Sequence, residues 1–276
     1  RIIEDVEIKH EESIRRPFAQ WVEENRVTFG HLPAAQNVPA TDFDTLVTRQ
    51  KQFGFSQEDL KIILGPMAMQ ASEPLGSMGD DIPMAVLSDR PRPLYDYFRQ
   101  LFAQVTNPPL DAIREKLVTS LVTTLGAEQD LFQESPLHCH QFRLEQPILT
   151  NRELKQLAEI DEQNLKGTTL PIVYPVKEGG PGLEKAIEDL CESAATRIDE
   201  GCSVLVLSDR NVSREQAPIP AILAVGAVHH HLIRAGKRTR CGIVLESGEP
   251  REVHHHCVLF GYGCCAVNPY LVYETI

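Results

Sequence analysis

Short apolar segments alternate with longer helical segments throughout the last third of the chain. Four apolar runs predict strands at 172–176, 202–207, 241–245 and 265–267. The three stretches between them place apolar residues at helical spacing, at 183–198, 219–234 and 253–260. Strands that alternate with helices in this way form right-handed βαβ units on a parallel sheet. Because the strands are short and wholly apolar, we expect burial on both faces, as in a barrel or a doubly wound sheet.

Composition excludes several classes of protein. The 276 residues are 42% hydrophobic, which is enough for one large core or two modest ones. The formal net charge is −12, so the chain lacks the basic surface that binds nucleic-acid phosphates or anionic lipid. Charged residues interrupt every apolar stretch before it reaches the length of a membrane span. Seven cysteines without a C-x-x-C pair are typical of reduced thiols, and we expect a cytoplasmic protein with neither a nucleic-acid nor a membrane partner.

The part of the chain before residue 172 has a weaker pattern. Apolar residues around Trp21 have helical spacing within 1–35, and 36–55 has the mixed composition of a connector. A capping box at Ser56–Asp59 predicts a short helix that Gly65 and Pro66 end. We further expect a strand at 84–87, helices at 94–102 and 113–125, a helix opened by a capping box at Thr150, and a turn at 179–182.

Polar residues directly follow three of the predicted strands. Chemistry on a parallel sheet gathers at the carboxyl ends of its strands, because the loops of several strands meet there. An acid, a base and an amide donor could therefore converge at this edge. In the simpler interpretation, which we favour, Asp209 and Ser247 cap neighbouring helices or turns and Arg210 pairs with a carboxylate. The candidate residues are Ser208, Asp209, Arg210, Glu246, Ser247 and Asn268.

Two histidine triplets, at 229–231 and 254–256, invite interpretation as a metal site. Consecutive helical residues point about 100° apart, so the three members of a triplet cannot all face one ion. Neither triplet supplies the H-x-x-x-H spacing of helical zinc ligands. One histidine from each triplet could still join Glu246 and Asp209 in a free-standing metal-dependent hydrolase on an α/β barrel, and this stays open as the alternative function.

Five separated motifs carry a resemblance to a known family. In the order of the sequence, the motifs are EPLGSMGDD (73–81), FAQVTNPP (102–109), LVLSDR (205–210), AVGAVHHH (224–231) and AVNPYL (266–271). With these motifs in this order, the chain resembles the central domain of the glutamate synthase large subunit over 60–276, and residues 1–35 resemble the tail of that enzyme's glutamine amidotransferase domain. The form of the first motif, EPLGSMGDD, is more similar to the pyridine-nucleotide-dependent type than to the ferredoxin type.

The resemblance implies a non-catalytic domain within a larger enzyme. That enzyme converts glutamine, 2-oxoglutarate and a reductant, here NADPH, into two glutamates at separate glutaminase and FMN and iron–sulfur sites. The family's central domain links those sites and helps to wall the ammonia tunnel. Its expected fold is a degenerate, TIM-barrel-like βα repeat related to the FMN-binding barrel. Ammonia assimilation and glutamate biosynthesis are the processes implied.

The resemblance also sets expectations for domains, sites and partners. We expect the amidotransferase tail and connector at 1–60 and the central domain at 61–276. No catalytic, cofactor-binding or metal residue is expected in this segment, and FMN and the cluster are expected outside it. The expected partners are the flanking amidotransferase and FMN-binding domains, with the enzyme's small subunit as a further candidate. Since the chain starts at Arg1 rather than Met, we expect it to be a piece of a longer polypeptide.

Overall fold

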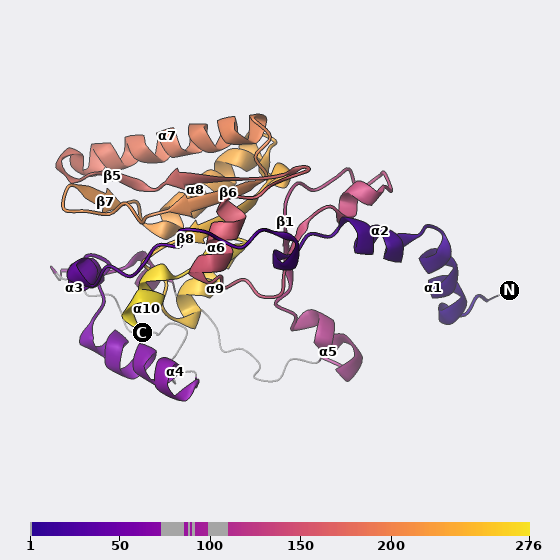
Figure 1. Ribbon diagram of the computed structural model, residues 1–276, viewed down its shortest axis with the longest axis horizontal. Coiled ribbons are helices and arrows are strands. Elements are labelled where there is room, and N and C mark those ends of the chain that lie inside the picture. The colour runs from indigo at the N-terminus through magenta and orange to yellow at the C-terminus, as the bar shows by residue number, and fades with distance from the viewer. Residues whose placement is uncertain (1, 73–85, 88, 90–91, 99–109) are drawn as a thin grey trace.

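A five-stranded sheet forms the centre of the protein (Figure 1). The computed structural model describes residues 2–72, 86–87, 89, 92–98 and 110–276. In spatial order the strands are β3 (Asp161–Glu162), β4 (Leu165–Pro171), β6 (Val204–Ser208), β8 (Gly242–Glu246) and β9 (Ala266–Asn268). The last four run parallel, and β3 pairs antiparallel with β4. The predicted α/β class with mainly parallel strands is confirmed, whereas the described residues form an open sheet and no closed barrel.

Long helices connect the parallel strands, as the apolar spacing predicts. The chain passes from β4 through α7 (Gly179–Asp199) to β6, then through α8 (Ala221–Arg234) to β8 and through α9 (Val253–Gly261) to β9. The predicted βαβ repeat is confirmed for these helices and for β6, β8 and β9, with ends displaced by a few residues. Residues 179–182 form the first turn of α7 rather than the expected separate turn.

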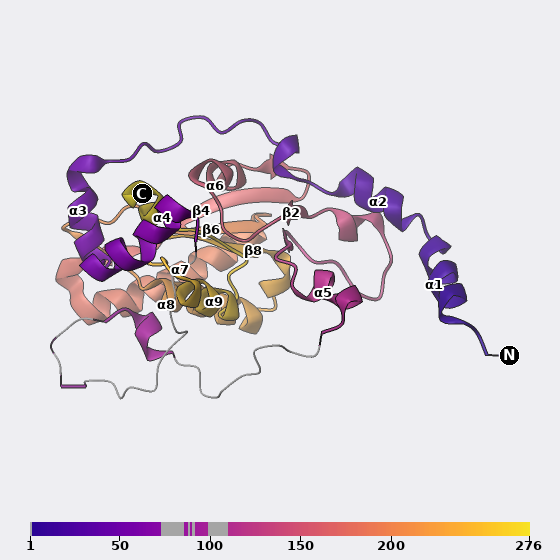
Figure 2. The ribbon, with the colours of Figure 1, turned by 90° about the horizontal axis from the view of Figure 1, so that it is seen from below.

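Alternate residues of the central strands build two cores. Leu205 and Leu207 face a cluster that includes residues of α7, α8 and α9, while Val204 and Val206 face a second cluster. That second cluster contains α6 (Asn151–Ala158) and the two-stranded sheet of β1 (Thr123–Leu125) and β2 (Phe142–Leu144). Figure 2 shows α7, α8 and α9 on one side of the sheet and α6 on the other. Both strand faces are buried, as their apolar composition predicts.

The strand predicted at 172–176 is wrong as a member of the parallel sheet. That place belongs to β4, whose sequence LKGTTLP mixes Lys and Thr with only two buried leucines. Gly167 in β4 lies so close to α6 that an added Cβ would be 2.3 Å from the Leu157 carbonyl oxygen. Close backbone approach therefore replaces apolar side chains there. The following segment β5 (Val173–Pro175) pairs antiparallel with β7 (Gln216–Pro218).

The helix predicted around Trp21 is confirmed, and one more helix lies in the expected connector. Helices α1 (Asp5–Ile14) and α2 (Phe18–Asn25) extend away from the sheet (Figure 1). The expected connector at 36–55 is wrong in part, because it contains α3 (Phe43–Gln52), which Asp42 caps by accepting from the amides of Asp44 and Thr45.

The capping box at Ser56–Asp59 is confirmed, but Gly65 and Pro66 do not end the helix. A π-helical stretch, η2 (Asp59–Leu64), leads directly into α4 (Gly65–Gln70), and proline is tolerated in the first turn of α4.

Three predictions concern the region between 84 and 125. Residues 84–85 of the expected strand lie outside the described residues, and 86–87 form a turn. The expected helix at 94–102 is described only as η3 (Leu94–Tyr97), a 3-10 turn, and 99–102 lie outside the description. The helix expected at 113–125 is wrong in its second half, since α5 (Ala112–Val118) ends there and Leu125 belongs to β1.

Several short elements complete the described chain. The capping box of α6 is confirmed, since the Thr150 and Glu153 side chains bond each other's backbone amides.

Within the described ranges, no helix combines the length and the apolar composition that crossing a bilayer requires. The remaining elements are the 3-10 turns η1 (Phe29–His31), η4 (Pro136–Cys139), η5 (Val176–Glu178) and η6 (Arg238–Arg240), and the last helix, α10 (Tyr270–Thr275).

Candidate functional site

The polar residues predicted at the carboxyl edge do converge. The register of the parallel strands places Ser208 beside Glu246 and Glu246 beside Asn268. The Ser208 hydroxyl donates to the Glu246 carboxylate, and so does the Arg210 guanidinium. Asn268 donates to the carbonyl oxygen of Leu149 at 2.8 Å. The expectation that strand ends assemble these side chains is therefore correct.

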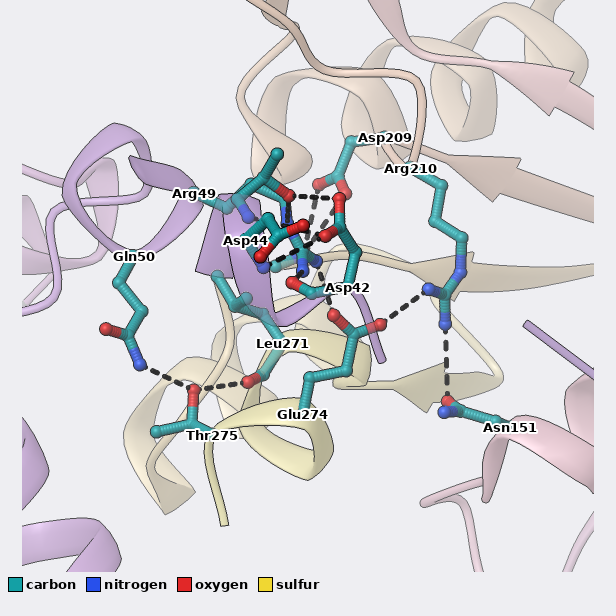
Figure 3. Close-up of polar contacts among 12 residues, drawn as sticks. Asp42, Asp44, Arg49, Gln50, Asn151, Asp209, Arg210, Leu271, Glu274 and Thr275 are labelled. Atoms are coloured by element: carbon teal, nitrogen blue, oxygen red, sulfur yellow. Dashed lines mark hydrogen bonds and ion pairs between the residues drawn. The ribbon is translucent and has the colours of Figure 1, made fainter. Parts of the chain in front are cut away.

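A chain of ion pairs crosses this edge (Figure 3). Glu274 of α10 accepts from Arg210 at 2.8 Å and also from Arg49 of α3, and its side chain is only 3% exposed. Arg210 in turn pairs with Glu246, so the predicted pairing of Arg210 with a carboxylate is confirmed. Burial opposes the charge of Arg210, but Glu246 and Glu274 outweigh it and raise the pKa of the guanidinium. We call Arg49, Glu274 and Arg210 the clasp.

The aromatic ring of Tyr270 supports the clasp from within α10. The Arg210 guanidinium carbon lies 4.2 Å from the centre of that ring, in a cation–π arrangement. Arg210 also donates to the Asn151 side chain at the start of α6 at 3.4 Å. Each clasp charge has an opposite charge beside it, so the clasp crosslinks α3, α10 and the strand ends.

Asp209 lies beneath this edge and is completely buried. It accepts from the Ser247 hydroxyl at 2.5 Å and from the Gly248 amide at 3.1 Å. Burial raises the pKa of Asp209 to about 8, although the Ser247 hydrogen bond acts in the opposite direction. Ser247 Oγ also accepts from the Glu249 amide at 3.1 Å, so these residues organise the turn after β8 as the simpler interpretation predicts.

Glu249 was not among the predicted site residues, although its position is structurally specific. Both of its carboxylate oxygens accept from the Ala221 amide at 3.2 Å, which caps the N-terminus of α8. Burial raises the pKa of the Glu249 carboxyl to about 7. The negative charge of Glu249 also contributes to the raised pKa of Asp209. Two carboxyls with raised pKa values therefore lie in the turns that follow β6 and β8.

Open space adjoins the clasp and the end of α3. A cavity of about 880 Å³ is lined by residues of α3, α10 and the loop between β6 and β7, including all three clasp residues. A second cavity of about 690 Å³ lies beyond the end of α3 and is lined by Phe53, Glu249, Arg251 and His255, among others. The carboxyl edge of the sheet is thus partly filled by the chain itself.

The first histidine triplet lies far from this edge along the strands. His229 accepts from the Arg238 side chain at 2.9 Å, and Arg238 also donates to the carbonyl oxygens of Cys241 and Gly263. These carbonyls belong to the segments that lead into the amino ends of β8 and β9. Burial and the neighbouring Arg238 lower the pKa of His229. His229 therefore faces the end of the sheet opposite to Asp209 and Glu246.

The second triplet is held by its own protein contacts. His255 pairs with Glu252 at 2.9 Å and stacks on Tyr95 with ring centres 4.3 Å apart. Burial lowers the pKa of His255, and His256 donates from Nδ1 to the Glu252 carbonyl oxygen at 2.9 Å. In the described part of the chain, no group of three or more His, Cys, Asp or Glu side chains could hold a metal ion. The two triplets do not assemble with Asp209 and Glu246, so the alternative of a metal-dependent hydrolase is not supported.

Some residues of the site could not be found from local pattern. Arg49 lies in the stretch interpreted as a connector, although Asp42 followed by a polar first turn is an N-cap signal that indicates α3. Glu274 and Tyr270 lie in the final helix, which no periodic pattern predicted. For Asn151, the sequence indicates only a place in the capping box of α6.

Comparison with known proteins places the chain in a family. Residues 48–276 match the family described as "Glutamate synthase central domain". The NADPH glutamate synthase large chain of Bacillus subtilis is 45% identical over 100% of this chain and 18% of its own length. The NADH glutamate synthase of Schizosaccharomyces pombe is 41% identical over 100% of this chain and 14% of its own. The ferredoxin-dependent chloroplast enzyme of Spinacia oleracea is 40% identical over 100% of this chain and 17% of its own. The chain spans less than a fifth of these relatives.

Proposed function

The chain belongs to the glutamate synthase central-domain family, and from this premise we propose that it is a non-catalytic connecting domain of a glutamate synthase large subunit. The family predicted from the sequence motifs is thereby correct. The proposed parent reaction converts glutamine, 2-oxoglutarate and a reductant into two glutamates. The similarity to the Bacillus subtilis large chain favours NADPH as the source of the electrons.

The mutual charge pairing at the carboxyl edge is the observation that carries this proposal. In βα folds the loops at that edge commonly form the active site. Here α3 and α10 partly cover it, and Arg49, Arg210, Glu246 and Glu274 compensate one another's charge. A charge that is already paired contributes to structure more readily than to chemistry on a substrate. We therefore propose that no catalytic, cofactor-binding or metal residue belongs to this segment.

A role in guiding ammonia follows from the chemistry of the parent reaction. Ammonia that reaches bulk water is protonated and loses its nucleophilic lone pair, so a wall that excludes water protects the intermediate. We propose that this domain supplies part of such a wall between the glutaminase and synthase sites. FMN and the iron–sulfur cluster are expected to bind outside this segment. The flanking amidotransferase and FMN-binding domains are the proposed partners, and the small subunit is a further one.

The proposed division of the chain keeps the connector at 1–60 and the central domain at 61–276. The proposed relation to the FMN-binding barrel is supported by four parallel strands with a helix between successive strands. The proposed location is the cytoplasm, with no nucleic-acid or membrane partner. Superposing this sheet on the FMN-binding domain of the same polypeptide tests the relation, and a different strand direction or handedness would overturn it.

Activity measurements separate this proposal from an independent enzyme. The full-length polypeptide should form glutamate from glutamine and 2-oxoglutarate with NADPH, and it should contain flavin. The 276-residue segment alone should show neither glutaminase activity nor a flavin spectrum, once circular dichroism has established that it is folded. Stoichiometric flavin or a measurable glutaminase rate in the folded segment would contradict the proposal. Near-stoichiometric zinc, manganese or iron in the purified segment would favour a metalloenzyme instead.

A further inference from the structure

We infer that the turn at 130–133 is a docking site for the amidotransferase domain proposed to precede this segment, and that Leu131 and Phe132 are the side chains which enter that domain. This inference rests on the proposed function and adds a contact surface to it. Its basis is the exposure of the two side chains, which is 90% for Leu131 and 98% for Phe132.

Hydrogen bonds to Asp130 hold this turn in one shape. The Asp130 carboxylate accepts from the Phe132 amide at 3.0 Å and from the Gln133 side chain at 3.1 Å. The Asp130 carbonyl oxygen accepts from the Gln133 amide and from the His138 ring, each at 3.0 Å. The backbone around Leu131 and Phe132 is therefore fixed, and it directs both side chains away from the protein.

Large apolar residues are unusual at the tip of such a turn. Surface turns favour Gly, Pro, Asn, Asp and Ser, because these residues suit the backbone geometry and lose little in water. The second core includes the fully buried Phe142, a few residues further along the chain, and yet Leu131 and Phe132 do not enter that core. Isolated exposed apolar side chains are ordinary, whereas adjacent large ones on a fixed tip are typical of a contact with another protein surface.

Helix α1 brings further apolar side chains to the same turn. Arg15 and Arg16 directly follow α1, and both pair with Glu134, Arg16 at 3.5 Å. Ile14, the last residue of α1, is 64% exposed, and Val6 is 76% exposed. These two residues lie on one side of α1, because eight residues make slightly more than two helical turns. We call Val6, Ile14, Leu131 and Phe132 the apolar end.

The position of α1 in the sequence favours the preceding domain as the occupant. Residues 1–47 precede the family match at 48–276, although the Bacillus subtilis relative matches the whole chain. The chain joins the second core only from Val27, which pairs with Phe142, and Leu32, which is buried there. Helix α1 therefore lies between that core and the domain proposed to come before it. In the proposed parent, that domain is attached a few residues before α1, beside the apolar end.

A covalent attachment also explains why so small a surface is sufficient. Two separate proteins usually need an interface of more than about 1,000 Å² to form a stable complex. A domain on a short tether is held at a roughly millimolar effective concentration, so a few well-placed apolar side chains can keep it docked. Aromatic side chains such as Phe132 contribute most to contacts of this kind.

Phe43 provides a matched control for Phe132. It is also a largely exposed phenylalanine, at 75%, and it is the first residue of α3. Figure 1 places α3 and α1 at opposite ends of the molecule. A change at Phe43 should therefore leave the contact at the apolar end intact.

The experiment uses the full-length polypeptide in four forms: unmodified, Phe132→Ser, Phe132→Leu and Phe43→Ser. The readout is the rate at which trypsin cleaves after Lys9, Arg15 and Arg16, followed by mass spectrometry. We expect Phe132→Ser to raise this rate several-fold, because the undocked domain leaves α1 accessible. Phe132→Leu keeps an apolar side chain and should retain slow cleavage, and Phe43→Ser should do the same. Equal cleavage of the unmodified and Phe132→Ser polypeptides would overturn the inference.

A second measurement needs no substitution. In the native full-length polypeptide, hydroxyl radicals should oxidise Phe132 several-fold more slowly than in the urea-unfolded polypeptide. Full reactivity of Phe132 in the native polypeptide would overturn the inference. Protection that disappears on dilution, together with a fall in particle mass, would assign the surface to a second copy of the chain and also overturn it. Absence of glutaminase activity from the unmodified polypeptide would instead contradict the proposed function, which is a separate result.

Discussion

The buried carboxyl of Asp209 should make the stability of this protein fall as pH rises. Its pKa is about 8 in the folded protein, against an ordinary value of 3.8. Between these two values the folded protein keeps a proton that the unfolded chain releases, so the free energy of unfolding decreases with pH. The contribution is fully present below the ordinary pKa and is lost as pH rises to the folded pKa.

The size of the effect follows from the linkage relation. One pKa unit corresponds to about 1.4 kcal/mol, so Asp209 alone lowers the free energy of unfolding by about 3 kcal/mol between about pH 5.5 and 7.5. Glu249, with its pKa of about 7, adds a slope of the same sign at lower pH. Asn has the shape of a protonated Asp, and its amide oxygen can still accept from the Gly248 amide. The Asp209→Asn variant should therefore lose about half of the pH dependence.

Urea unfolding followed by circular dichroism at several pH values measures this slope. Glu215→Gln is the matched control, because Glu215 is an exposed acid in the loop that follows the same strand. We expect the control to keep the slope of the unmodified protein. The reasoning is refuted if the unmodified protein is equally stable across the range, or if Asp209→Asn keeps the full slope.

Three further substitutions test the packing and capping described above by the same urea assay. An alanine Cβ at Gly248 would lie 2.6 Å from the Phe53 ring, so Gly248→Ala should cost about 1–3 kcal/mol. Gly180→Ala in α7 meets no atom within 4 Å and should cost nothing; equal effects of the two would contradict the close approach. Thr150→Ala should cost about 1 kcal/mol by removing the cap of α6, and no change would show that the cap adds nothing. Leu207→Ala should cost roughly 2–5 kcal/mol because its side chain is fully buried; a smaller loss would mean that the core repacks.

The local pattern of apolar residues predicts the strands correctly where burial alone decides the structure. The strands VLVLS and GIVLE are buried at every residue, so their composition identified β6 and β8 and the edge at which their polar neighbours meet. The strand LKGTTLP was missed because Gly167 replaces side-chain packing with backbone contact. The predicted helix at 113–125 is longer than α5, because leucines at helical spacing continue beyond the end of α5 into β1.

The pairing of Arg49 with Glu274 in the clasp could not be predicted from the sequence for a different reason. Arg49 and Glu274 are separated by nearly the whole chain, and neither lies in a segment whose periodicity indicates burial. Three-dimensional pairing of two charges leaves no trace in the composition around either residue. The same limit applies to Glu249, whose capping role depends on Ala221 in a helix that precedes it in the sequence. Contacts made by topology require the fold before they can be found.

The meeting of α3 and α10 also determines how a mechanical load would pass through the protein. A pull applied to α3 and to the end of α10 would act first on the contacts between those two helices. The segment before α3 is held separately, since Val27 pairs with Phe142 and Leu32 lies in the second core. The strands of the sheet would carry little of a force between α3 and α10, because both helices lie at the same edge. Helix α3 could then shift against α10 by shearing a few side-chain contacts, and the hydrogen-bonded sheet would remain unstretched.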